Sequence, residues 1–224
     1  MNSLQNIRKT EADFPRPEVI AEAAGIIRKG GLTVFPTSAL YGIGVNALDP
    51  EAVDKIFRIK GRSSGKAILV LIGNPEEVGL LALGVPQSAS DLMAHFWPGG
   101  LTIVLEAGPE LPQNLTAGSG KIGIRLCRHP VAAALIRAAG GPITGTSANL
   151  SGSPGCSRIS GLDSSIARNA DLIIDAGTLK GGTGSTVVDM TSGFPEILRE
   201  GTVPAKDILK IADRYSRNFV DRTV

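Results

Sequence analysis

The sequence has few of the residues that build metal centres and catalytic triads. Its 224 residues include only two cysteines and two histidines. Cys127 and Cys156 lie far apart without metal-ligand spacing, and only His95 and His129 are available to help them. We therefore expect neither a zinc site nor any metal held by side chains. The same scarcity leaves a serine with little prospect of a histidine base.

Aromatic side chains and long apolar runs are also scarce. Aromatic residues make up 4% of the chain, which removes the stacking platforms of single-strand nucleic-acid binders. No apolar run approaches the ~20 residues of a membrane span, and "MNSLQNIRKTEADFPRPEV" has no apolar core of a signal peptide. The net charge of +2 is too small to indicate RNA or membrane binding by bulk electrostatics. We expect a reduced, cytoplasmic protein without a membrane partner, in which any cationic function is local.

The composition that remains is that of an ordinary globular protein, with 42% hydrophobic and 20% charged residues. The length fits one well-filled domain. We expect residues 1–15 to be a polar lead-in and residues 16–224 to form the domain. Strands alternating with helices predict an α/β fold. The closely spaced strands at 101–127 and 185–199 predict antiparallel pairs, within a single twisted mixed sheet with flanking helices.

Capping residues and apolar periodicity give the expected elements. Helices are predicted at 17–29, 51–60, 75–80, 86–96, 130–139, 163–169 and 204–215. Strands are predicted at 32–37, 67–72, 101–107, 121–127, 142–147, 171–175, 186–190 and 196–200. The segments 38–48, 108–120, 148–161 and 177–185 are expected to be loops.

A basic cluster follows the predicted helix 51–60. Lys60, Arg62 and Lys66 fall within seven residues, and Gly61 lets the backbone turn out of the helix. Arginine offers a planar fork for phosphate oxygens and lysine a compact charge. One interpretation is a site for a polyanion such as ATP. The alternative, favoured by these residues alone, is a solvated loop whose cations offset the negative helix C-terminus.

A second candidate is the segment "TGTSANLSGSPGCS", residues 144–157. Small hydroxyl and amide residues after a strand suit the polar edge of a ligand, and glycines allow close backbone approach. The hydrolase elbow is absent because Asn149 stands where its second glycine belongs. Ser147 is therefore expected to bind rather than attack. A loop of Asx and Ser turns explains the composition equally well.

Two arginines lie in predicted strands. Arg125 in "KIGIRLCRHP" either faces water or is held for a carboxylate, and the pattern does not decide between them. Arg199 ends the strand "EILRE" and alone indicates nothing. The glycine-rich "KGGTGSTVVD" lacks the Gly-Lys-Ser/Thr of a phosphate-binding loop and precedes a strand, so we do not assign it as one.

Taken together and in order, these segments resemble the threonylcarbamoyl-AMP synthase family, also called the YrdC/Sua5 family. The resemblance covers residues 17–203 and includes Lys-x-Arg at Lys60 and Arg62 and Ser-x-Asn at Ser147 and Asn149. It rests on "GGLTVFPTSALYGIGVNA", "KIFRIKGRSSGKAILVLI", "FWPGGLTIVL", "IGIRLCRHP", "TSANLSG" and "GSTVVDM…EILREG". Each of these segments alone is moderately specific, but six of them in the same order make the resemblance strong.

The resemblance implies a YrdC/RibB-like α/β fold and a concrete reaction. The family condenses L-threonine, bicarbonate and ATP, with Mg²⁺ carried on ATP, into threonylcarbamoyl-AMP and pyrophosphate. The product supplies a downstream threonylcarbamoyl-transfer complex that modifies adenosine 37 of tRNA. By position, the resemblance implies catalytic roles for Lys60, Arg62, Ser147 and Asn149; ATP contacts from Arg62, Lys66, Lys121, Asn149, Ser157 and Arg199; and threonine contacts from Arg125 and Ser147.

Some positions depart from the family pattern. The first loop reads "PTSA", with Ser38 and Ala39, where Pro-Thr-Glu-Thr is common, and Leu71 stands where many long forms have a histidine near the threonine. Both Ala39 and Leu71 fit the short, YrdC-like branch. Two other functions remain open: a module that binds tRNA or double-stranded RNA, and a nucleotide-binding paralogue without threonine chemistry.

Overall fold

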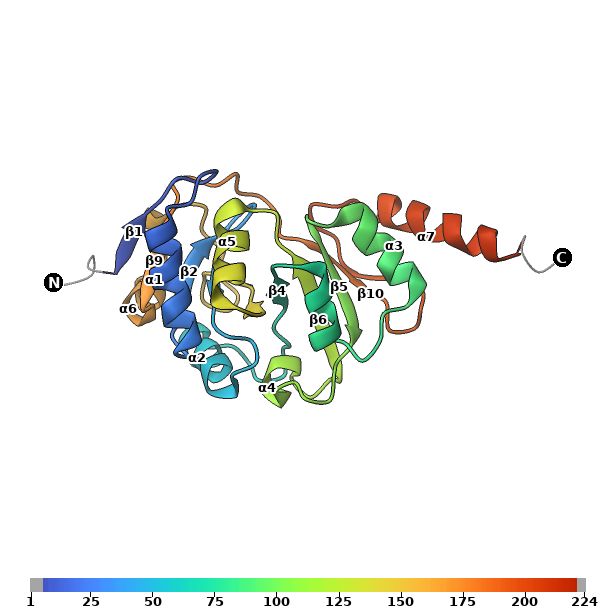
Figure 1. Ribbon diagram of the computed structural model, residues 1–224, viewed down its shortest axis with the longest axis horizontal. Coiled ribbons are helices and arrows are strands. Elements are labelled where there is room, and N and C mark those ends of the chain that lie inside the picture. The colour runs from blue at the N-terminus through green and yellow to red at the C-terminus, as the bar shows by residue number, and fades with distance from the viewer. Residues whose placement is uncertain (1–5, 221–224) are drawn as a thin grey trace.

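The structure is a computed structural model that describes residues 6–220, with side chains described as far as residue 212. Its elements alternate along the chain, as expected for an α/β protein (Figure 1). The helices are α1 (Pro17–Arg28), α2 (Pro50–Lys60), η1 (Pro75–Leu80), α3 (Gln87–Phe96), α4 (Gln113–Thr116), α5 (Pro130–Ala139), η2 (Ile159–Gly161), α6 (Ser164–Asn169) and α7 (Ala205–Val220). None of these described helices has the length and apolar character of a bilayer span.

The described strands form two mixed sheets rather than the single sheet predicted. The first has the order β1-β9-β2-β3-β8 and the second β11-β10-β5-β6-β4-β7. The strands are β1 (Ile7–Lys9), β2 (Thr33–Pro36), β3 (Tyr41–Gly44), β4 (Val70–Ile72), β5 (Leu101–Glu106), β6 (Lys121–Leu126), β7 (Ile143–Thr144), β8 (Thr146–Ser147), β9 (Leu172–Asp175), β10 (Thr186–Asp189) and β11 (Glu196–Arg199). The expected antiparallel pairs, β5 with β6 and β10 with β11, are present.

Gly145 explains why one predicted strand serves two sheets. The expected strand 142–147 divides there, so that β7 pairs with β4 in the second sheet and β8 pairs with β3 in the first. A Cβ atom on Gly145 would lie 2.5 Å from Leu71 Cγ. Only glycine fits this crossing, because the backbone passes directly over the second sheet. The sheets therefore meet beside Thr146 and Ser147.

Segments that were expected to be irregular contain regular structure. The segment 38–48 includes β3, which is buried throughout, and the segment 108–120 includes α4. In the polar lead-in, β1 pairs with β9, and Arg8 forms an ion pair with Glu22 of α1. Three- and four-residue elements carry too little periodicity to be distinguished from loops. Residues 1–5 of the lead-in lie outside the described part of the chain.

The ends of α2 follow from local sequence. The Asp49 carboxylate accepts hydrogen bonds from the backbone N–H groups of Glu51 and Ala52, at 3.0 and 3.1 Å. Pro50 occupies the first turn, and Gly61 ends the helix in the left-handed conformation with φ of 56°. These caps fix the positions of Lys60 and Arg62 at the helix end.

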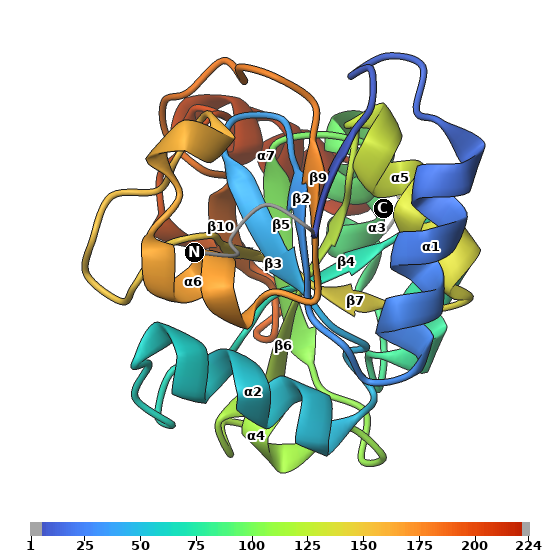
Figure 2. The same ribbon diagram turned by 90° about the vertical axis from the view of Figure 1, so that its left-hand side faces the viewer.

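Apolar packing surrounds the junction of the sheets. Helices α1 and α5 lie side by side and pack on the first sheet (Figure 2). A larger buried cluster joins residues of both sheets, including Tyr41, Ile43, Ile103 and Ile124. The two sheets are therefore packed against each other through a shared core.

Candidate functional site

A cavity of about 860 Å³ is lined by residues of both sheets. Its floor is one face of the second sheet. On β6 the alternate residues Lys121, Gly123 and Arg125 line it, as the two-residue period of a strand requires. Gly123 leaves the floor open, because a Cβ atom there would lie 3.3 Å from the methyl group of Thr102.

One cross-strand row carries two arginines into this cavity. Leu71 of β4 pairs with Arg125 of β6. Strands β5 and β6 pair antiparallel, with Ile103 opposite Ile124. The next pair in this register is Thr102 of β5 with Arg125 of β6. Thr102 pairs with Val187, and Val187 pairs with Arg199. Cross-strand neighbours share a face, so the Cα atoms of Arg125 and Arg199 lie three strand spacings, about 14 Å, apart.

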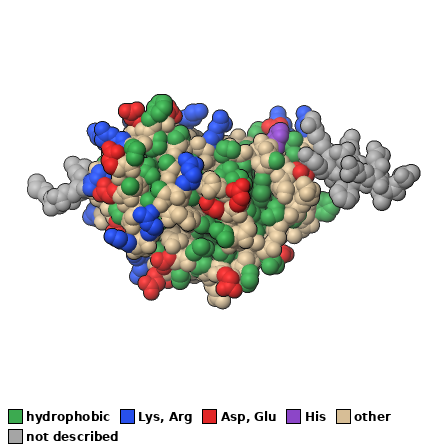
Figure 3. All heavy atoms as spheres, in the orientation of Figure 1, with side chains coloured by type: hydrophobic (Ala, Val, Ile, Leu, Met, Phe, Trp, Pro, Cys, Tyr) green, Lys and Arg blue, Asp and Glu red, His purple; other side chains and the backbone are tan. Residues whose placement is uncertain are grey.

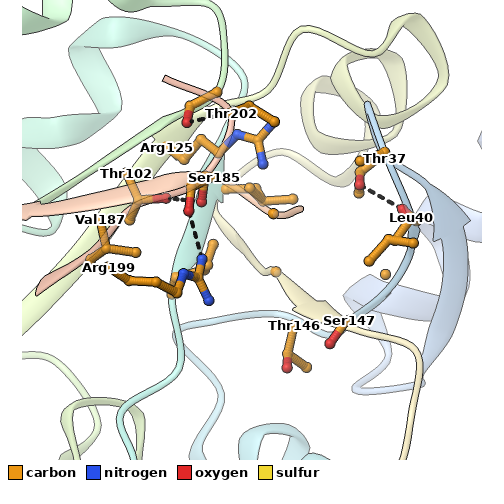
Figure 4. Close-up of a pocket in the computed structure, with 18 of the residues that line it drawn as sticks. Thr37, Leu40, Thr102, Arg125, Thr146, Ser147, Ser185, Val187, Arg199 and Thr202 are labelled. Atoms are coloured by element: carbon orange, nitrogen blue, oxygen red, sulfur yellow. Dashed lines mark hydrogen bonds between the residues drawn. The ribbon is translucent and has the colours of Figure 1, made fainter. Parts of the chain in front are cut away.

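The opposite wall comes from the first sheet and the loops beside it. Figure 4 shows Thr37, Leu40, Thr146 and Ser147 facing the row that contains Arg125 and Arg199. Thr37 Oγ1 donates a hydrogen bond of 2.6 Å to the carbonyl oxygen of Leu40. The N–H of Gly181 donates to the carbonyl oxygen of Ala39 at 3.0 Å, which ties the loop 177–184 to the loop 37–40.

The lining concentrates positive charge. It includes six cationic residues and one acid: Arg62, Lys121, Arg125, Arg128, Lys180, Arg199 and Asp189. Asp189 accepts a hydrogen bond from Lys121 Nζ at 2.7 Å. Burial opposes ionisation of Asp189, but hydrogen bonds from Lys121 and Thr191 outweigh it and lower its pKa. A chain of nearly neutral net charge thus has a strongly cationic cavity, suited to an anionic ligand.

The Arg125 side chain is held by hydrogen bonds within the protein and lines the cavity. Its Nε donates to the carbonyl oxygen of Gly99 at 2.7 Å, and Nη2 lies 3.4 Å from Ser38 Oγ. The residue is 9% exposed, and burial lowers its pKa. No described acid forms an ion pair with it. A buried guanidinium without an anion is a favourable partner for a ligand carboxylate.

Arg62 and Arg199 line the cavity through side chains fixed on carbonyl groups. Arg62 donates from Nε to Lys66 O at 3.1 Å and from Nη2 to Ala67 O at 2.7 Å. Burial lowers the pKa of Arg62. Arg199 donates from Nη2 to the carbonyl oxygen of Ser185 at 2.7 Å. Each retains further N–H groups for anionic oxygens.

Lys60 lies outside the cavity lining. It is 3% exposed, and its Nζ donates to the carbonyl oxygens of Ser147 and Asn149 at 2.5 and 2.6 Å. Burial, with a smaller effect of the Arg62 charge, lowers its pKa to about 8. The last turn of α2 directs this ammonium inward, where it holds the Ser-x-Asn backbone. Its contact with the site is therefore indirect.

Five of the nine residues expected at the site converge on the cavity: Arg62, Lys121, Arg125, Ser147 and Arg199. Lys60, Lys66, Asn149 and Ser157 are not part of its lining. Lys66 is exposed, whereas Asn149 Nδ2 donates to backbone carbonyls of Leu150 and Ser153. The Oδ1 atom of Asn149 is buried without a hydrogen-bond partner. The Ser157 carbonyl accepts from the Leu179 N–H and so supports the loop 177–184.

Sequence reasoning missed several lining residues. Arg128 and Lys180 bring charge from loops, and Thr102 and Ser185 place two hydroxyl groups between the arginines. Ser185 lies within "KGGTGSTVVD", a segment that the sequence analysis did not assign as a phosphate-binding loop and that contributes to the cavity lining. Because side chains alternate along a strand, the sequence indicates which residues of β5 and β10 share one face. Which strands adjoin depends on pairing that a single sequence does not reveal.

The donor set indicates how a metal ion fits this site. Among the described residues, no group of three or more His, Cys, Asp or Glu side chains is placed to hold an ion. Asp189, the acid in the lining, is already paired with Lys121. Mg²⁺ is commonly bound through substrate phosphates with few protein ligands. The residues present fit a metal ion that arrives on a nucleotide.

Comparison with known proteins agrees with this architecture. A sequence profile of the Sua5/YciO/YrdC family, described as telomere recombination, matches residues 25–201. Threonylcarbamoyl-AMP synthase from Pyrococcus abyssi is 38% identical over 189 residues, which cover 84% of this chain and 56% of the relative. The chain thus spans about half the length of that protein.

Solved structures share the fold. P. abyssi Sua5 complexed with L-threonine superposes with a TM-score of 0.85 at 36% identity, covering 92% of this chain and 60% of the other. E. coli YciO superposes with a TM-score of 0.80 at 30% identity, covering 92% of this chain and all of YciO (100%). These matches confirm the predicted α/β class and the resemblance found in the sequence. The chain therefore belongs to the Sua5/YciO/YrdC family.

Proposed function

We propose that this protein is an L-threonylcarbamoyladenylate synthase. It would condense L-threonine, bicarbonate and ATP into threonylcarbamoyl-AMP and pyrophosphate. The name of the P. abyssi relative and the threonine complex of P. abyssi Sua5 support this proposal. Because the chain spans about half of the longer relatives, the activity of the whole relative is carried over here as a proposal.

The observation that carries the proposal is the row that joins Arg125 to Arg199 across the cavity floor. The Cα atoms of the two arginines lie about 14 Å apart. Their guanidinium groups can each bind one anion and bring the two anions together over Thr102 and Val187. A carboxylate on Arg125 and phosphates on Arg199, Arg62 and Lys121 would satisfy this arrangement. The remaining cations then favour the highly charged nucleotide.

The chemistry needs positioning rather than a protein nucleophile. The threonine amine adds to bicarbonate with loss of water to form a carbamate. A carbamate oxygen then attacks the α-phosphorus of ATP, and the bond from that phosphorus to the pyrophosphate oxygen breaks. The protein must align the two anions and neutralise charge on the leaving pyrophosphate. The cationic lining with Ser147 at its edge suits this task, and Mg²⁺ bound to ATP would supply further charge neutralisation.

The chemistry of the proposed product indicates which partners the protein would need. Threonylcarbamoyl-AMP is a reactive mixed anhydride, so a transferase complex that modifies tRNA at adenosine 37 would be expected to consume it. Direct binding of tRNA or double-stranded RNA is the alternative role. On the described part of the face in Figure 3, basic and acidic side chains are mixed, with more basic ones over the half that carries α1. Among the described residues, this face therefore carries no broad, uniformly basic surface of the kind that RNA binding uses.

Omission of single substrates tests the proposal. We expect pyrophosphate release in the presence of Mg–ATP, L-threonine and bicarbonate, and background release when threonine is absent or the buffer is carbonate-free. Tight nucleotide binding without threonine-dependent release would instead indicate a paralogue that binds ATP. RNA affinity that falls steeply with salt, again without turnover, would indicate an RNA-binding module.

A further inference from the structure

Two buried hydroxyl groups face each other between the arginines. Thr102 Oγ1 and Ser185 Oγ lie 2.7 Å apart, and the residues are 1% and 3% exposed. Both line the cavity. Figure 4 shows this hydrogen bond beside the bond from Arg199 to the Ser185 carbonyl. The pair therefore lies on the cavity floor at the point where ligands on Arg125 and Arg199 would meet.

The number of hydroxyl protons leaves one donor uncommitted. Two hydroxyl groups carry two protons, and the hydrogen bond between them uses one. Within the described part of the protein, neither hydroxyl has a second hydrogen-bond partner. A buried hydrogen-bond donor without an acceptor is destabilising. The free proton therefore needs an acceptor in the cavity, which an oxyanion would provide.

The surroundings of Thr102 favour an arrangement in which Ser185 keeps the free proton. Thr102 is β-branched, and its methyl group packs towards Gly123, so its rotamer is restricted. The cation of Arg125 is its neighbour in the cross-strand row. A nearby cation favours a hydroxyl whose oxygen faces it and whose proton points away, here towards Ser185. Either hydroxyl can be the donor in this hydrogen bond; when Thr102 donates to Ser185, the Ser185 proton is left to point into the cavity.

We propose that Thr102 is a positioning residue, which orients the Ser185 hydroxyl to donate a hydrogen bond to the carboxylated amino-acid substrate. The inference rests on the proposed function for the identity of that acceptor, a carbamate or carboxylate oxygen of threonine. Thr102 itself acts through Ser185. The nucleotide, held by Arg62, Arg199 and Lys121, does not depend on this hydrogen bond.

Three variants test this role: Thr102→Val, Thr102→Ser and the matched control Thr33→Val. Thr33 is another fully buried strand threonine, but it lies in the first sheet and its hydroxyl has no partner. We expect Thr102→Val to lower kcat/KM for threonine roughly three- to ten-fold, with Mg–ATP affinity and the unfolding midpoint unchanged. Thr102→Ser should retain the wild-type value within about two-fold, and Thr33→Val should match the wild type.

The outcomes separate this inference from the proposed function. If the wild type binds L-threonine by calorimetry but releases no pyrophosphate, the proposed function fails, and the threonine affinity of Thr102→Val decides the inference. If the wild type binds no threonine, both fail. The inference alone is overturned if Thr102→Val behaves like Thr33→Val. It is also overturned if Thr102→Ser is as impaired as Thr102→Val, because the methyl group would then matter rather than the hydroxyl.

Discussion

The ammonium nitrogen of Lys60 lies 2.6 Å from the carbonyl oxygen of Asn149 and holds the Ser-x-Asn backbone from within the protein. Its other acceptor is the Ser147 carbonyl, and no described acid pairs with it. The Lys-x-Arg and Ser-x-Asn segments, far apart in the sequence, are thus joined physically. A buried cation in such a position makes stability depend on pH.

Lys60→Met should change that pH dependence. The pKa of Lys60 is lowered from its ordinary value of 10.5 to about 8 in the folded protein. Between these values the unfolded chain binds more protons, so this group raises stability as pH rises through the window. The free energy of unfolding, measured in urea from pH 7.5 to about 10, should rise more steeply in the wild type than in Lys60→Met. Parallel curves would show that Lys60 is not desolvated.

Arg62→Ala should weaken nucleotide binding while leaving the fold intact. The loss of a charged, pre-fixed guanidinium predicts a decrease in Mg–ATP affinity of roughly ten- to hundred-fold. Arg58→Ala is the control, because Arg58 is an exposed cation in the last turn of α2, close to Arg62 in the sequence, and is not part of the lining. Calorimetric titration with a non-hydrolysable ATP analogue compares the two. Equal affinities would remove Arg62 from the site.

Arg125→Lys should act on the amino acid rather than on the nucleotide. Lysine keeps the charge but loses both the bidentate fork and the bond from Nε to Gly99. We expect the KM for threonine to rise by about ten-fold or more, with Mg–ATP affinity within about two-fold. Steady-state pyrophosphate release at varied threonine measures the first quantity. A rise in nucleotide Kd with an unchanged threonine KM would assign Arg125 to the phosphates instead.

Gly145→Ala should disturb the point where the chain crosses between the sheets. The new Cβ would lie 2.5 Å from Leu71 Cγ and 2.9 Å from Leu69 Cδ1, so core side chains or the backbone must move. A loss of about 1–3 kcal/mol in unfolding free energy is expected. The control is Gly141→Ala, where no atom lies within 4 Å of the added Cβ. If both variants unfold at the same denaturant concentration, the crossing accommodates a Cβ atom at position 145 without loss of stability, which contradicts the steric role of Gly145.

The sequence predicted the α/β class and most helices, because caps such as Asp49 and Gly61 and long apolar periods are local signals. It did not predict the division into two sheets. That division depends on Gly145, whose steric role arises from Leu69 and Leu71, far away in the chain. Short elements such as β3 and α4 were also missed, since they contain too few residues to show a period.

Only part of the candidate site was predicted from the sequence, and the reasons are similar. Arg125 and Arg199, which only the family resemblance assigned to the site, do line the cavity. Lys60 was grouped with Arg62 by spacing, but the direction of its side chain follows from the packing of α2. Thr102 gave no signal, because its importance arises from the register of β5 between β6 and β10.

A crystal structure with L-threonine and a non-hydrolysable ATP analogue tests the central claim most directly. We expect the threonine carboxylate on Arg125, the phosphates on Arg199 and Arg62, and both ligands in the cavity of about 860 Å³ between the sheets. A nucleotide bound elsewhere on the protein, or a cavity that admits only one of the two ligands, would contradict the account.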